Sequence, residues 1–108
     1  MTAWCMEIRF SQREIEEIRN YFNRIDSGET HKQLCGQHQE FPEWNTVFLL
    51  LRKLLAYGIY YNVPTDPGTN YEDLQKKSQK PDSMLVTVHT HLGRFKNLLA
   101  NYTAIYAV

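Results

Sequence analysis

The chain has 108 residues, among them 12 basic and 12 acidic side chains that leave a formal net charge of zero. This length predicts a single domain over residues 1–108, and zero net charge excludes an overall field that would attract nucleic acid or an anionic membrane. Two cysteines are too few for a disulfide framework, and residues 1–10 lack the continuous apolar segment of a signal peptide. We therefore expect a cytoplasmic protein that binds neither nucleic acid nor membranes.

The first ten residues alternate between apolar and polar side chains, which is the two-residue period of an extended strand. Trp4, Met6, Ile8 and Phe10 fall on one side of this segment. Because a single short strand has no partner in this sequence, we expect an extended N-terminal arm. Its apolar edge would pack on the helices or on another subunit.

The segment 11–26 carries the signals of a first helix. Ser11 and Glu14 have the spacing of a capping box, in which each side chain pairs with the other residue's backbone N–H. Gly28 is the residue type that commonly ends a helix. Between these signals, large apolar side chains recur at helical spacing and predict the buried face: Ile15, Ile18, Phe22 and Ile25.

Residues 30–40 are ambiguous, because Gly36 weakens a helix and few apolar side chains are available to bury one. We expect a loop or one frayed turn. If the segment were helical, the i, i+4, i+7 spacing of His31, Cys35 and His38 would place three metal ligands on one face. Zinc would still need a fourth ligand or water, so the competing interpretation is a polar surface turn with an exposed thiol.

The run from residue 42 to 61 is apolar on nearly every face and predicts a buried central helix. Pro42 suits the first helical position, where its missing N–H would have no partner in any case. A helix this apolar needs several neighbours to cover it. A membrane span is excluded, because a span needs about 20 predominantly apolar residues and the adjacent Arg52 and Lys53 interrupt the run.

A short surface helix is expected after the central one. Residues 62–69 contain two prolines and a glycine and predict an irregular connection. Thr69 and Glu72 have capping-box spacing, which predicts a helix over 70–79. That helix has almost no apolar face, so we expect it on the surface.

The last helix is predicted over 83–106, with Asp82 or Ser83 as its N-cap. Alternating β-branched residues over 84–92 would also suit a strand, but the apolar spacing that continues beyond them favours a helix. Gly93 costs this helix about 1 kcal/mol relative to alanine and indicates a close approach of another helix or a kink. The apolar positions have heptad spacing: Leu85, Val88, Leu92, Phe95, Leu99, Tyr102 and Tyr106.

Five of the seven tyrosines lie at the ends of two predicted helices: Tyr57, Tyr60 and Tyr61 in the central one, and Tyr102 and Tyr106 in the last. Antiparallel helices would keep the two groups apart, whereas parallel helices or a dimer would bring them together. Each tyrosine could close the core with its hydroxyl in water. The sharper interpretation is a binding surface, because tyrosine is enriched where proteins bind each other. A third interpretation is a pocket for a small aromatic or nucleotide-like ligand.

These patterns predict an all-α fold, a small bundle of three main helices with a short surface helix and an extended N-terminal arm. No catalytic motif stands out; for example, no histidine follows a glutamate by three residues, as a di-iron bundle requires. We therefore expect a small intracellular, non-enzymatic module without a cofactor that binds another protein as a subunit, adaptor or inhibitor. Homo-oligomers are expected through the last helix or the arm, because a short chain has little area to cover its apolar stripes. The alternative is a metal- or small-ligand-binding helical protein that uses His31, Cys35 and His38, with zinc as the metal.

Overall fold

The computed structural model describes residues 8–29, 42–64 and 70–106, and the structural statements below refer to these ranges. Within them the chain contains helices and no strand, so the all-α fold class is confirmed. The helices are α1 (Gln12–Asp26), α3 (Pro42–Tyr60), α4 (Tyr71–Lys76), α5 (Pro81–Thr90) and α6 (Leu92–Tyr106).

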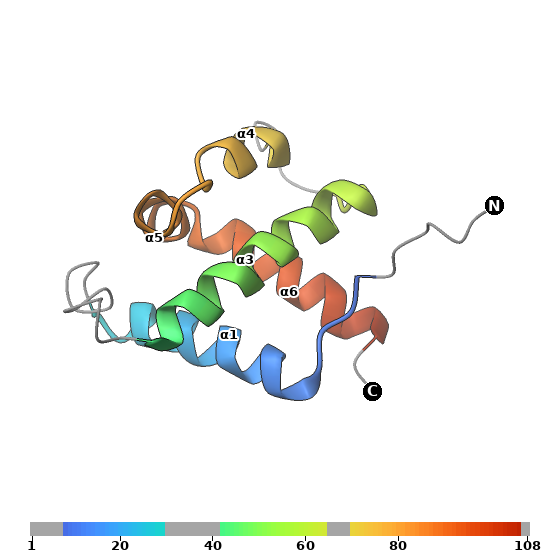
Figure 1. Ribbon diagram of the computed structural model, residues 1–108. Coiled ribbons are helices and arrows are strands. Elements are labelled where there is room, and N and C mark those ends of the chain that lie inside the picture. The colour runs from blue at the N-terminus through green and yellow to red at the C-terminus, as the bar shows by residue number, and fades with distance from the viewer. Residues whose placement is uncertain (1–7, 30–41, 65–69, 107–108) are drawn as a thin grey trace.

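The helix α3 lies at the centre of this structure. It contacts each of the other four helices of the described chain, with α1 along one side, α4 along the other and α6 crossing behind it (Figure 1). In the same view α1 runs roughly opposite to α3, whereas α6 crosses α3 obliquely, and the C-terminal ends of α3 and α6 lie on the same side of the molecule. The predicted central helix is therefore confirmed. Of the helices in the described ranges, none combines the length and the apolar character that crossing a membrane needs.

The helix α1 begins and ends at local sequence signals. Ser11 Oγ accepts a hydrogen bond from the Glu14 N–H at 3.1 Å, and the Ser11 N–H donates to Glu14 Oε1 at 2.8 Å, which completes the predicted capping box. At the other end Gly28 adopts the left-handed conformation, with a φ of 96°. The Glu29 N–H then donates to the Arg24 carbonyl at 3.1 Å, as in a Schellman ending. Both predictions for this helix are confirmed.

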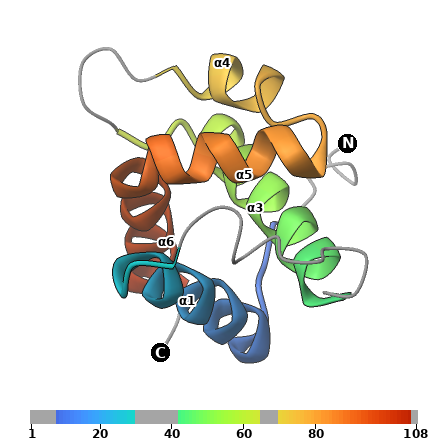
Figure 2. The ribbon, with the colours of Figure 1, turned by 90° about the vertical axis from the view of Figure 1, so that its left-hand side faces the viewer.

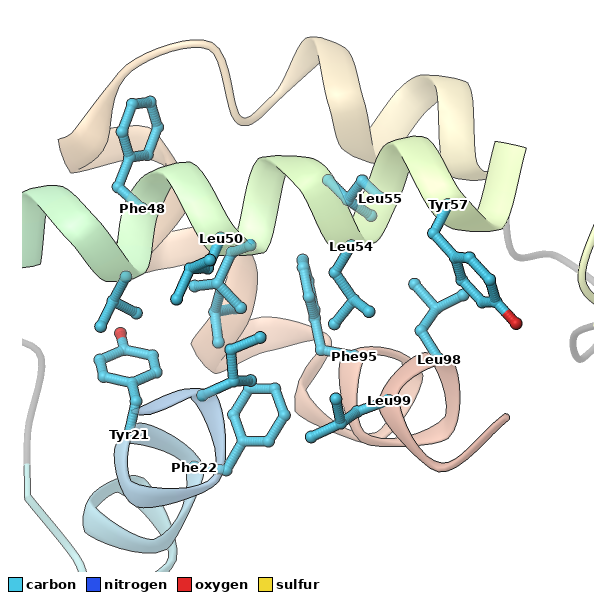
Figure 3. Packing of buried hydrophobic residues seen from close by; sticks show 14 of the residues in the cluster. Tyr21, Phe22, Phe48, Leu50, Leu54, Leu55, Tyr57, Phe95, Leu98 and Leu99 are labelled. Atoms are coloured by element: carbon cyan, nitrogen blue, oxygen red, sulfur yellow. The ribbon is translucent and has the colours of Figure 1, made fainter. Parts of the chain in front are cut away.

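The apolar core surrounds about half of the circumference of α3. At 100° per residue, its buried positions extend from Tyr57 through Leu54 to Phe48. Figure 3 shows Leu54 of α3 next to Phe95 of α6, both of which are fully buried. The opposite strip of α3 is open to solvent, and Leu49 there is 61% exposed. The helix is thus apolar on more sides than its neighbours cover.

The surface helix α4 is shorter than predicted and has a different cap. It is capped by Asn70, whose Oδ1 accepts hydrogen bonds from the N–H groups of Glu72 at 2.9 Å and Asp73 at 3.1 Å. The predicted cap, Thr69, lies outside the described residues. The helix ends at Lys76 rather than near residue 79, because its only buried side chain, Leu74, gives it little to pack on the core.

The predicted helix over 83–106 is wrong as a single helix. The structure divides it, since α5 ends at Thr90 and α6 begins at Leu92. His91 between them has a φ of −119° and a ψ of 37°, outside helical geometry. Figure 2 shows that α5 and α6 run in clearly different directions.

The break lets one heptad stripe cover two sides of α3. A straight helix from 83 to 106 would be roughly 35 Å long and could follow α3 along one line only. As two helices, both α5 and α6 contact α3. The heptad side chains therefore remain in the core of a single chain, fully buried or half-buried: Leu85, Val88, Leu92, Phe95, Leu99, Tyr102 and Tyr106.

The start of α5 and the place of Gly93 also differ from the prediction. α5 begins at Pro81 with Lys80 as its N-cap residue, and Ser83 Oγ accepts a hydrogen bond from the Lys80 N–H at 3.3 Å. The cap is thus neither Asp82 nor Ser83, because Pro81 already fits the first helical position. Gly93 lies in the first turn of α6, and an added Cβ there would meet nothing within 4 Å. A close helix approach does not explain this glycine, whereas a bend does lie directly beside it.

Two glycine substitutions test the packing of α3. A Cβ at Gly58 would lie 2.8 Å from Leu98 Cδ2 and 3.3 Å from the ring of Tyr71, and Leu98 is fully buried. We expect Gly58→Ala to be less stable than Gly93→Ala by about 1–3 kcal/mol, the usual cost of overpacking. Both variants gain similar helix propensity, so their difference isolates the contact. Urea unfolding of the two proteins measures it, and equal stabilities would contradict this account.

Candidate functional site: a cluster of five tyrosines

The five tyrosines at the two helix ends meet within one chain and are called the tyrosine cluster below. Tyr57 is its centre, with ring centroids 5.0 Å from Tyr61, 5.3 Å from Tyr102 and 6.5 Å from Tyr106. Tyr60 stands edge-on against Tyr61 at 4.8 Å. The C-terminal ends of α3 and α6 bring these rings together within one chain, so their meeting requires no dimer.

Helix endings place the α3 members of the cluster. Asn62 adopts the left-handed conformation, with a φ of 51°, and the Val63 N–H donates to the Gly58 carbonyl at 3.1 Å. This Schellman-type ending stops α3 at Tyr60. Asparagine is one of the few residues that adopt this conformation readily, so a local signal for the ending is present in the sequence.

The cluster has a buried base and an exposed edge. Tyr57 and Tyr102 are 1% and 2% exposed and belong to the core, as Figure 3 shows for Tyr57 beside Leu98. Tyr61 and Tyr106 are half-buried, and Tyr60 is 51% exposed. The exposed edge that a partner can reach in this structure therefore consists of Tyr60, Tyr61 and Tyr106.

The hydroxyl of Tyr102 fastens the N-terminal segment to α6. It accepts a hydrogen bond from the Phe10 N–H at 2.8 Å and lies 3.4 Å from the Phe10 carbonyl, across 92 residues of sequence. The two rings also pack edge to face, with centroids 5.0 Å apart. Ile8 and Phe10 are buried while Arg9 is exposed. The extended arm is thus observed over residues 8–10, whereas Trp4 and Met6 lie outside the described residues.

The hydroxyl of Tyr57 donates to Asn101 Oδ1 at 2.6 Å. Burial raises the pKa of the Tyr57 phenol, and the neighbouring phenols of Tyr106, Tyr61 and Tyr102 raise this pKa further. The neutral form of Tyr57 is therefore the one that the fold favours. Asn101 was not a candidate in the sequence, because 44 residues separate it from Tyr57.

Two cations contact the aromatic rings from outside. The guanidinium carbon of Arg9 lies 4.0 Å from the centre of the Tyr106 ring, and Lys53 Nζ lies 4.6 Å from that of Phe10. Sequence reasoning missed both contacts, because each cation is far along the chain from the ring that it contacts. The exposed edge of the cluster is therefore aromatic with a positive charge beside it.

The residues proposed for zinc cannot be placed. His31, Cys35 and His38 all lie outside the described residues. Within the described ranges, no three His, Cys, Asp or Glu side chains gather as a metal site would require. The zinc interpretation therefore stays a prediction from the sequence.

The tyrosine cluster presents aromatic rings and hydroxyl groups at the surface. Its outer rings offer apolar faces with hydroxyl donors and acceptors. No protein-family model, curated protein or solved structure matches the chain. The cluster is therefore interpreted from its own geometry.

Removing the hydroxyl of Tyr102 tests the link to the N-terminal segment. In Tyr102→Phe the buried Phe10 N–H loses its acceptor, so we expect a loss of about 1–3 kcal/mol in the free energy of unfolding. Hydrogen exchange of the Phe10 amide should accelerate in proportion. Tyr106→Phe is the matched control, because its ring is half-buried and the same atom is removed. Equal losses in the two variants would contradict the link.

The raised pKa of Tyr57 predicts a loss of stability at alkaline pH. The unfolded phenol titrates near pH 10.0, and the folded one holds its proton to higher pH. The folded state therefore binds more protons above about pH 10, and stability falls there as pH rises. Tyr57→Phe lacks this loss but also lacks the bond to Asn101, which is worth about 1 kcal/mol. The stability advantage of the unmodified protein over Tyr57→Phe should be constant up to about pH 9 and shrink towards pH 11. Urea unfolding across this range measures the difference, and a constant difference would refute the assignment.

Proposed function

We propose that this protein is a small, non-enzymatic module that binds another protein through the exposed edge of the tyrosine cluster, as a subunit, adaptor or inhibitor. One observation supports the proposal above the others. Half-exposed Tyr60 packs edge-on against Tyr61, which packs on the buried Tyr57. An accessible aromatic side chain is thus held by a stack of rings that continues into the core.

A supported ring is a favourable contact because it is ordered before the partner arrives. Binding commonly costs about 0.5–1.5 kcal/mol for each flexible side chain that must be fixed, and a tyrosine packed on other rings has already lost much of that freedom. Tyrosine also presents a large apolar area together with a hydrogen-bonding hydroxyl. The edge therefore has the properties of residues that dominate binding energy in protein interfaces.

The residues beside the edge fit the same function. Arginine and tyrosine are both enriched among residues that contribute most to binding, and Arg9 stacks on Tyr106 at this place. We expect the partner surface to be apolar with carboxylate or carbonyl acceptors facing Arg9. A second copy of the chain would have to use this or another accessible surface, because the heptad side chains are covered within one chain. A cytoplasmic location is part of the proposal and rests on the low cysteine content.

Substitution of Tyr60 tests this function in the cells that make the protein. We expect Tyr60→Ala to leave the fold intact, because exposed positions usually change stability by less than about 0.5 kcal/mol. Recovery of the partner with the purified full chain should fall by at least about tenfold, which is the effect of losing a dominant interface residue. Quantitative mass spectrometry of the co-purified proteins, with native mass spectrometry for the subunit count, measures both.

The matched control is Leu49→Ala. Leu49 is also on α3 and is 61% exposed, but it lies eleven residues before Tyr60, about 16 Å along the helix axis. This variant should retain the partner in full. If Leu49→Ala loses the partner while Tyr60→Ala keeps it, the binding surface lies around Leu49 in the first half of α3 and the tyrosine cluster is structural.

A further inference from the structure

A hollow between α1 and α6 is the second feature of the surface that could receive a ligand. Its volume is about 320 Å³, and none of the five clustered tyrosines is among its described lining residues. Its place in the fold follows from two helices that run in opposite directions side by side (Figure 1). The residues that line it are Arg19, Phe22, Asn23, Asp26, Lys96, Leu99, Ala100 and Thr103.

The two helices face each other across the hollow with matching spacing. An ion pair between Lys96 and Asp26 closes one end. From there the lining residues of each helix recur at steps of three and four, which keeps them on one face. Because the helices are antiparallel, this register sets Arg19 and Thr103 together at the opposite end.

A short side chain explains why space remains between the helices. Ala100 occupies the middle of the α6 row, and its methyl group leaves the gap that a longer residue would fill. Phe22 and Leu99 beneath it are buried and form an apolar floor. The hollow is therefore apolar at its base and polar at its two ends.

The charges at the two ends are unequal. Lys96 is neutralised by Asp26, whereas Arg19, an exposed side chain, has no ion-pair partner among the described residues. One positive end, an amide from Asn23 beside it, and an apolar floor complement an anion with an apolar body. Arg19 and Asp26 are seven residues apart, about 10 Å along the helix, which limits that body to a single ring or a short chain.

We propose that the hollow binds a small carboxylate with an aryl or alkyl body. The carboxylate pairs with the Arg19 guanidinium, whose planar donors match its two oxygens, and the body lies on Phe22, Leu99 and Ala100. This site is separate from the exposed edge of the tyrosine cluster. The outcome of its test therefore does not depend on whether the proposed function is correct.

The test titrates the isotope-labelled full chain with hydrocinnamate and, separately, with its neutral amide. These probes share one body and differ in charge. We expect saturable shifts of backbone amide resonances in α1 and α6 around Asn23 and Ala100, with a dissociation constant for hydrocinnamate in about the millimolar range. The neutral amide should bind about fivefold more weakly, because it cannot form the charge-assisted pair.

Three variants assign the contacts. Arg19→Gln should remove the preference for the carboxylate, whereas Arg13→Gln, which loses the same charge on the same helix outside the hollow, should keep it. Ala100→Leu should weaken both probes by at least about tenfold by filling the space; Ala100 is exposed, so the fold remains. The proposal is overturned if neither probe gives saturable shifts, if the amide binds as tightly as the carboxylate, or if Arg13→Gln weakens hydrocinnamate as much as Arg19→Gln does.

Discussion

The need to cover α3 determines the rest of this structure. Its buried arc, from Tyr57 through Leu54 to Phe48, spans about half of the helix, which is wider than the stripe of a helix with one neighbour. No single helix can cover such an arc, and a chain of 108 residues has room for few other helices. Each of the other described helices is therefore used against α3. The break at His91 belongs to this constraint, because it gives α3 two neighbours from one heptad stripe.

The tyrosine cluster is a consequence of that break. After His91, α6 crosses α3 obliquely, and the tyrosine-rich C-terminal ends of both helices lie on the same side of the molecule. Tyr102 and Tyr57 then use their hydroxyls inside the chain, on Phe10 and Asn101. Only the outer rings remain for contact with other molecules. Burial of the inner phenols and exposure of Tyr60 are thus two results of one packing arrangement.

Local signals in the sequence predicted most of the helices. They did not predict contacts between residues that are far apart along the chain. The capping box at Ser11 and the ending at Gly28 involve residues within a few positions of each other, so spacing alone locates α1. The break at His91 escaped prediction because the heptad period continues through it, and Gly93 gave only an indirect sign. The bond from Tyr102 to Phe10 spans 92 residues, and no pattern in one sequence indicates such a pair. The sequence places the tyrosines at two helix ends. Whether these ends meet depends on the directions of the two helices, which no pattern in one sequence indicates.

Different residues of α6 contribute to the core, to the hollow beside α1 and to the tyrosine cluster. Phe95, Leu99 and Tyr102 are buried in the core. Ala100 is one of the α6 residues that line the hollow beside α1. Tyr106, the last residue of α6, belongs to the exposed edge of the cluster. The heptad side chains of α6 are buried or half-buried within the chain. The geometry of the ring edges and of the hollow is thus fixed by the same core contacts that hold α6 against α3.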